Sequence, residues 1–168
     1  MENEIINRVA NSKLVVVNLE DYYPKGQRTV FDIKNWLFQE LVLREKDFRA
    51  HVSEHDWSQY QDHYVALTCT SDAIVPAWAF MLLTIHLQPY AKTIVVGSLE
   101  QLETSIYQEV IQNIETDAFV DQPLIIKGCT NKPVPANAYI MLSQKLKPLA
   151  RSIMYGEACS SVPLYKRK

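Results

Sequence analysis

The sequence predicts an α/β protein with a mainly parallel sheet flanked by helices. Short apolar, β-branched segments alternate with segments of helical periodicity along the chain, which is the order typical of parallel sheets covered by helices. A segment that begins with Cys-Thr and leads into Pro-Ala-x-Ala-aromatic also occurs twice, from Cys69 and from Cys129. This recurrence predicts an internal repeat of a βα unit, over about residues 63–97 and 123–156.

Length and composition predict a single α/β domain that spans residues 1–168. A chain of 168 residues normally forms one domain, and it can bury roughly 70% of its unfolded surface. Its content of 48% hydrophobic and 21% charged residues is that of an ordinary globular protein.

Five strands are predicted by short runs rich in Val, Ile, Leu and Thr. The first run is continuous and β-branched, so we expect it in the middle of the sheet. Each of the other four is followed closely by a glycine or a cysteine. In chain order the runs cover residues 13–19, 63–68, 93–96, 123–126 and 152–155. Residues 29–43 fit either a short amphipathic helix or two short strands.

Four helices are predicted from apolar residues that recur at helical spacing. Phe48 and Val52, for example, are spaced to share one face of the first helix. Pro76 and Pro135 are expected at the first helical position, where the missing N–H of proline costs no hydrogen bond. The predicted helices cover residues 45–54, 76–90, 99–114 and 135–149.

A Val-Pro pair follows each of the three cysteines, Cys69, Cys129 and Cys159, within a few residues. Each cysteine also follows a predicted strand. Because ligands of parallel sheets bind outside the carboxyl ends of the strands, we expect the three thiols along that edge. An odd number of cysteines does not suit a secreted disulfide framework. In a reducing compartment they are expected to be free thiols, metal ligands or redox groups.

The three cysteines predict a metal site. Thiolates are ligands for zinc, copper(I) and iron–sulfur clusters. Three thiols leave one position of a tetrahedral site open, and Asp72 could fill it, with His55 and His63 as other candidates. The predicted metal ligands are therefore Cys69, Cys129, Cys159 and Asp72, and the predicted cofactor is zinc or an iron–sulfur cluster.

Two other interpretations remain open at this point. Helices that begin at Pro76 and Pro135 place a positive helix end close to two of the thiols, which suits a persulfide carrier or a thiol nucleophile. Alternatively, the cysteines pack in the core of an interaction domain that has no enzymatic activity, because free cysteine is often simply buried. The sequence does not decide whether the protein is an enzyme or whether it forms a homo-oligomer.

Several classes of function are disfavoured by composition. Only four glycines are present, so neither a phosphate-binding loop nor a dinucleotide-binding motif occurs, and no nucleotide cofactor is expected. A net charge of −2 and a pI near 6.1 argue against nucleic-acid binding, which needs a basic surface.

No membrane association is expected either, and a cytoplasmic location is predicted. The longest apolar stretch, residues 73–85, is shorter than the roughly 20 residues that a membrane span needs. The first residues, Met-Glu-Asn-Glu, lack the basic and then apolar pattern of a signal peptide.

Several stretches taken together carry a resemblance that covers nearly the whole chain. They are Phe31-Asp-Ile-Lys34, Glu45-Lys-Asp-Phe-Arg49, His55-Asp-Trp57, Tyr64-Val-Ala-Leu-Thr-Cys69, Asp72-Ala-Ile-Val-Pro76, Lys127-Gly-Cys129, Val134-Pro135 and Val162-Pro-Leu-Tyr-Lys166. With them the chain closely resembles a bacterial family of uncharacterised proteins, catalogued as domain of unknown function 2480.

The resemblance implies no activity, but it implies a metabolic process in which the protein takes part. Genes of this family often neighbour iron–sulfur assembly genes, which favours sulfur or metal handling and iron–sulfur assembly proteins as partners. The family's cysteine positions map onto Cys69, Cys129 and Cys159. The leading hypothesis is therefore an accessory factor in iron–sulfur or sulfur metabolism, which binds a metal or carries sulfur through these cysteines.

Overall fold

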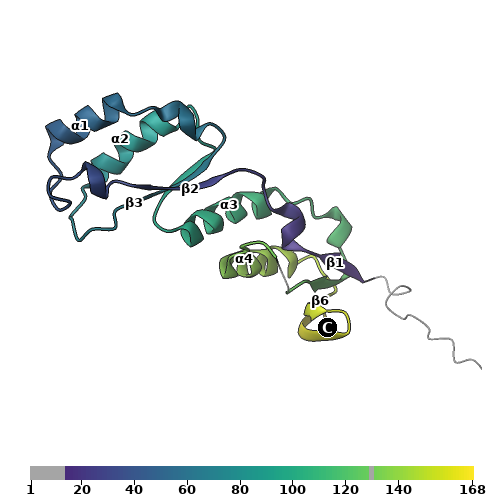
Figure 1. Ribbon diagram of the computed structural model, residues 1–168. Helices are drawn as coiled ribbons and strands as arrows, with labels where there is room; N and C mark the ends of the chain where they lie inside the picture. Colours follow the sequence, from purple (N-terminus) through teal and green to yellow (C-terminus); the bar gives the residue numbers. More distant parts are fainter. Residues whose placement is uncertain (1–13, 129–130) are drawn as a thin grey trace, which may run out of the picture. The chain divides into compact units, whose positions relative to one another are not determined.

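The computed structural model describes residues 14–128 and 131–168, and it divides the chain into two compact units (Figure 1). The central unit is Pro24–Ile106, and the terminal unit joins Tyr107–Lys168 to the described residues up to Tyr23. Each unit has its own sheet and its own hydrophobic core. The α/β class with mainly parallel strands is confirmed, although the strands form two sheets instead of one. The single domain over residues 1–168 stays a prediction.

The central unit contains a parallel sheet with the strand order β2-β3-β4. The middle strand is buried from Tyr64 to Leu67, as expected for a strand covered on both faces. Helices α1 and α2 lie side by side (Figure 1), where the edge of Phe48 meets Trp78 at 5.8 Å between ring centroids. The elements are β2 (Arg28–Asp32), a 3₁₀ helix (Lys34–Trp36), α1 (Glu45–Glu54), a 3₁₀ helix (Trp57–Tyr60), β3 (Tyr64–Thr68), α2 (Ala77–Leu87) and β4 (Thr93–Val96).

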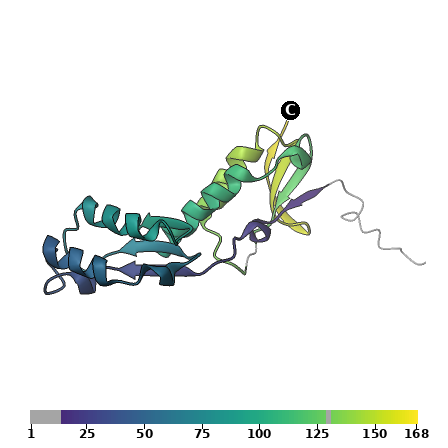
Figure 2. The same cartoon turned by 90° about the horizontal axis from the view of Figure 1, so that it is seen from above.

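The terminal unit contains a sheet with the order β1-β5-β6-β7, in which only the last pair of strands is antiparallel. Strand β1 lies at the edge of this sheet, so the expectation that the first run occupies the middle is wrong. Helix α3 (Leu99–Asn113) contributes residues to both units. Its C-terminal part lies beside α4 (Figure 2), where Lys145 Nζ donates to the carbonyl oxygens of Ile111 and Ile114 at 2.6 and 3.0 Å. The other elements are β1 (Val15–Val17), a 3₁₀ helix (Leu19–Tyr22), a 3₁₀ helix (Asp117–Phe119), β5 (Pro123–Ile126), α4 (Ala136–Leu146), β6 (Ser152–Glu157) and β7 (Ser160–Lys166).

Helices α2 and α4 begin in the same way, one residue later than predicted. Pro76 and Pro135 are extended, with ψ of 146° and 150°, and act as N-caps instead of first helical residues. Their carbonyl groups accept the first helical hydrogen bonds, from Ala79 and Ala138. The N-cap position requires non-helical ψ, and proline supplies its φ without needing an N–H partner. Both helices also end three residues earlier than predicted.

Equivalent contacts occur within each unit at corresponding positions. Thr84 Oγ1 donates to the carbonyl oxygen of Phe80 at 2.8 Å, and Ser143 Oγ donates to that of Tyr139 at 2.7 Å. Asp62 and Asp121 precede the next strand with positive φ angles of 61° and 55°. These pairs describe a common geometry, whereas a duplicated unit stays a prediction.

Sequence analysis left one segment between two alternatives and missed another. Residues 29–43 form β2, a 3₁₀ helix and an isolated bridge between Phe38 and Val42. Strand β7 was missed because most of its side chains are exposed and it contains Pro163, both of which argue against a strand. As for membranes, none of the described helices combines the length and apolar character that a span requires.

Candidate thiol site

The structure places two of the three cysteines, and they lie in different units. Cys69 follows β3 directly and is partly buried. Cys159 is exposed in the turn between β6 and β7, so it follows a strand as expected. Cys129 lies outside the described residues. Neither of the two described cysteines is in a disulfide.

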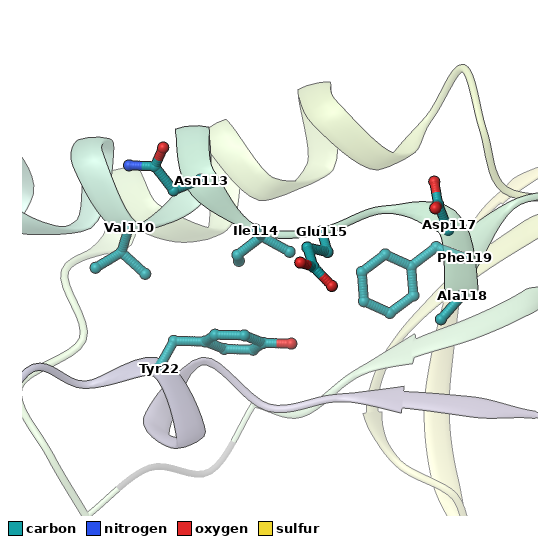
Figure 3. A pocket seen from close by; sticks show the side chains of 8 residues that line it. All are labelled: Tyr22, Val110, Asn113, Ile114, Glu115, Asp117, Ala118 and Phe119. Carbon is teal, nitrogen blue, oxygen red and sulfur yellow. The ribbon is translucent and has the colours of Figure 1, made fainter.

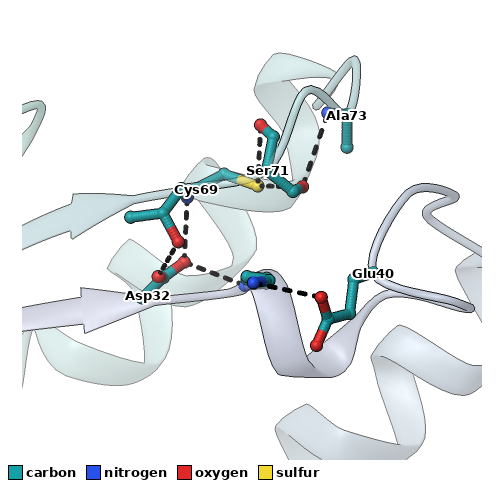
Figure 4. A network of polar contacts seen from close by, with 7 residues as sticks. Asp32, Glu40, Cys69, Ser71 and Ala73 are labelled. Carbon is teal, nitrogen blue, oxygen red and sulfur yellow. Dashed lines mark hydrogen bonds and ion pairs between the residues drawn. The ribbon is translucent and has the colours of Figure 1, made fainter.

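A carboxylate fastens the loop that carries Cys69 (Figure 4). Asp32 ends β2 and pairs in register with Thr68, so it lies at the carboxyl edge of the sheet. Its carboxylate accepts hydrogen bonds from the N–H and hydroxyl of Thr70 at 3.2 and 2.5 Å, and from the N–H of Lys34 at 2.9 Å. Burial alone would raise the pKa of Asp32, but the hydrogen bonds from Thr70 and Lys34 outweigh it and lower that pKa.

The thiol of Cys69 faces polar groups of the same loop. Its Sγ lies 3.2 Å from Ser71 Oγ and 3.9 Å from the carbonyl oxygen of Ser71 (Figure 4). Ser71 Oγ also accepts a hydrogen bond from the N–H of Ala73 at 3.4 Å. The loop therefore folds back around the sulfur and holds a hydroxyl group beside it.

A lysine supplies positive charge at this edge. Lys34 Nζ lies 3.0 Å from a carboxylate oxygen of Glu40 (Figure 4). The hydrogen bond and charge of Glu40 raise the pKa of Lys34, and the charges of Asp32 and Cys69 add smaller contributions in the same direction. Lys34 is thus paired mainly with Glu40, and its charge acts on the Cys69 loop only as a smaller contribution.

The predicted metal ligands are only partly placed. Asp72 is exposed in the Cys69 loop. His63 Nδ1 lies 3.0 Å from Thr29 Oγ1, and His55 Nε2 lies 3.0 Å from the hydroxyl oxygen of Tyr60, so both have partners of their own. Within residues 14–128 and 131–168, no group of three His, Cys, Asp or Glu side chains could hold a metal ion. The metal site that includes Cys129 stays a prediction.

The corresponding loop of the terminal unit is also fastened by a carboxylate. Glu20 Oε1 accepts hydrogen bonds from the backbone N–H of Asn131 and, at 2.8 Å, from that of Lys132. Asn131 follows directly on the undescribed residues 129–130. Glu20 thus takes the role in the terminal unit that Asp32 takes in the central unit, which the cysteine repeat alone did not reveal.

Among the described residues, His55 is surrounded by aromatic rings and belongs to no group of three His, Cys, Asp or Glu side chains that could hold a metal ion. Four rings lie at centroid distances of 4.7 to 5.7 Å from its imidazole, those of Phe31, Trp36, Trp57 and Tyr60. Burial lowers the pKa of His55, and the charge of Asp56 opposes this only in part. This cluster is part of the central core.

A cavity of about 700 Å³ opens in the terminal unit (Figure 3). Its wall combines the rings of Tyr22 and Phe119 with the carboxylates of Glu115 and Asp117. No cysteine is among its lining residues, so the cavity is separate from the thiol chemistry predicted from the sequence.

Comparison with known proteins adds the family. The model of a family described as Protein of unknown function (DUF2480) matches residues 3–167. The chain belongs to this family. No curated protein and no solved structure matches the chain.

The family description assigns no reaction, so the chemistry must be read from the site. Sequence analysis singled out Cys69 and Asp72, but neither Ser71 beside the thiol nor the bond from Thr70 to Asp32 that fastens the loop. Two signals were available: Asp32 ends a strand at the same edge, and Ser71 lies two residues after the cysteine. The arrangement places a partly buried thiol beside the hydroxyl group of Ser71, at the edge of the sheet that also carries Lys34.

Proposed function

We propose that the protein handles sulfur through Cys69, as an accessory factor in sulfur or iron–sulfur metabolism. The observation that supports this proposal is the position of the thiol. Cys69 lies at the carboxyl edge of a parallel sheet, where ligands of such sheets bind. Its Sγ is 3.2 Å from the hydroxyl oxygen of Ser71, and Lys34 supplies the positive charge.

The proposed step is the transfer of one sulfur atom. The Cys69 thiolate attacks the outer sulfur of a persulfide on a donor, the donor's S–S bond breaks, and the donor leaves as a thiolate. Cys69 loses its proton to water before the attack, and the donor thiolate takes one proton from water afterwards, so the protons balance. The Ser71 hydroxyl can donate a hydrogen bond to the sulfur, and the Lys34 ammonium offsets its charge.

Sulfur loading of single variants tests this proposal. The full chain is incubated anaerobically with glutathione persulfide, and each cysteine-containing peptide is analysed by mass spectrometry for one added sulfur atom. We expect loading on Cys69, its loss in Cys69→Ser, and slower loading in Lys34→Met. The matched control is Cys159→Ser, which should load normally at Cys69. Equal loading of Cys69→Ser and the wild type would contradict the proposal.

The predicted metal site is tested on the same variants. If Cys69, Cys129 and Cys159 bind a metal, elemental analysis of protein purified anaerobically should find near-stoichiometric zinc or iron. Asp72→Ala should weaken the binding of that metal. Each Cys→Ser variant is then expected to lose metal. Unchanged metal content in all three variants would exclude the site. If the cysteines merely pack in the core, Cys69→Ala costs modest stability and changes neither loading nor metal.

A further inference from the structure

The outer edge of β4 is open to pairing with another strand. β4 is the last strand of the central sheet, and no described strand pairs with its other edge. The N–H of Gly97 donates to the carbonyl oxygen of Leu67 in β3 at 2.9 Å. Since backbone groups alternate sides along a strand, those of Ile94 and Val96 point to the open edge. The strand reads Thr-Ile-Val-Val, without the charges or proline that commonly protect such edges.

An apolar hollow lies beside this edge. It has a volume of about 620 Å³ and is lined by Val96 of β4 and by Val75, Ala77, Phe80, Met81, Thr84 and Ile85. None of these residues is charged. A second hollow of about 290 Å³ is shared between α1 and α2, and Met81 and Ile85 line it too. These two side chains, each 64% exposed, therefore form a ridge between two hollows.

We propose that β4 and α2 form a two-fold dimer interface with a second copy of the chain. The two β4 strands pair in antiparallel fashion, with Val95 of each copy on the axis and Ile94 of each copy opposite Val96 of the other. Both outward-facing residues then exchange backbone hydrogen bonds. The α2 helices come to lie on the same face of the combined sheet, so that the ridge of each copy packs into the hollow of the other.

Two observations favour a second copy as the occupant. A two-fold contact brings identical groups together, and neither β4 nor the hollow beside it carries a charge that would repel its counterpart. The second hollow carries one charge of each sign, on Glu45 and Arg49. In addition, β6 is the last parallel strand of the other sheet, and its outer edge does pair with an antiparallel strand, β7. A stable interface buries about 800 Å² per partner. The four-residue strand is too short to bury this area alone, so the ridge and hollows must contribute the rest.

The mass of the full chain in solution tests the dimer. Light scattering or sedimentation at micromolar concentration should give twice the chain mass of 19.4 kDa. Val96→Pro and Ile85→Lys should both give monomers. Proline is tolerated at position 96 within the sheet, because the N–H it removes points away from β3. Hydrogen exchange should show the amides of Ile94 and Val96 protected in the dimer and unprotected after dilution.

The matched control is Ile140→Lys on α4, whose side chain is 60% exposed and lies in the other unit. This variant should remain a dimer, and circular dichroism should show all three variants folded. A monomeric wild type would overturn the proposal. So would a dimer that survives Val96→Pro, or one that Ile140→Lys dissociates. These outcomes do not depend on Cys69, so the dimer and the sulfur proposal stand or fall separately.

Discussion

At the residue scale, two polar side chains of the central unit have contacts with residues that are distant in the sequence. Asp32 binds the loop after β3 through Thr70, and His55 is enclosed by rings from β2 and the neighbouring 3₁₀ helices. Sequence analysis named Asp32 only within a stretch that carries the family resemblance, and His55 as a candidate metal ligand. Their actual partners depend on the pairing of β2 with β3 and could not be read from spacing.

The burial of His55 predicts a pH dependence of stability. Because the pKa of His55 is lowered on folding from its ordinary 6.5, the unfolded chain binds the proton more tightly. The free energy of unfolding is therefore highest above pH 6.5 and falls as the pH drops through that value toward the folded pKa. Urea unfolding between about pH 8 and pH 5 should show this fall.

Replacing the imidazole separates His55 from other groups in this experiment. His55→Gln should flatten the dependence between these pH values, whereas His51→Gln on the exposed face of α1 should keep it. The lowered pKa values of Asp32 and Asp56 start from 3.8, so these groups act only at lower pH. An unchanged slope in His55→Gln would show that the histidine does not cause the fall.

At the element scale, short runs and helical periodicity predicted most elements well. The bounds of α1, β4 and β5 agree with the predicted ranges 45–54, 93–96 and 123–126. These elements have patterns that do not depend on distant neighbours. β7 is different, because its largely exposed residues become a strand only by pairing with β6.

A buried ion pair connects β2 to α3 and predicts a large loss of stability on mutation. Arg28 Nε lies 2.7 Å from Glu103 Oε1, and the two side chains are only 11% and 6% exposed. The guanidinium also lies 4.6 Å from the centroid of the Tyr64 ring. Arg28→Met leaves the Glu103 carboxylate buried without this partner and should lower the free energy of unfolding by about 3 kcal/mol.

Urea denaturation measures this loss, with Arg151→Met as the control. Arg151 pairs with Asp121 at 3.1 Å, but both side chains are more than half exposed, so the urea midpoint should hardly move. Similar midpoints for the two variants would mean that the Arg28–Glu103 pair contributes little to stability.

At the scale of the whole molecule, two sheets with separate cores replace the single sheet that was expected. The predicted single domain is tested by cooperativity. Leu83 and Leu142 occupy corresponding places on α2 and α4, each fully buried in the core of its own unit. Replacing either by alanine should cost about 3 kcal/mol.

Thermal unfolding followed by calorimetry distinguishes one domain from two. In a single cooperative domain, Leu83→Ala and Leu142→Ala both lower the midpoint of one shared transition. Two transitions, of which each variant moves only one, would contradict the single domain. The matched positions make the comparison direct, because both mutations remove the same atoms from fully buried sites.

The sequence by itself determined the α/β class, most strands and helices, and Cys69 at the end of a strand. These features depend on local patterns of hydrophobicity, turn residues and proline. Only the tertiary structure decided that the strands form two sheets, that Asp32 fastens the Cys69 loop and Ser71 lies beside the thiol, and that no described strand pairs with the edge of β4 beside an apolar ridge. Strand order and side-chain partners arise from contacts between distant segments, and such contacts leave no signature in the spacing of residues along one chain.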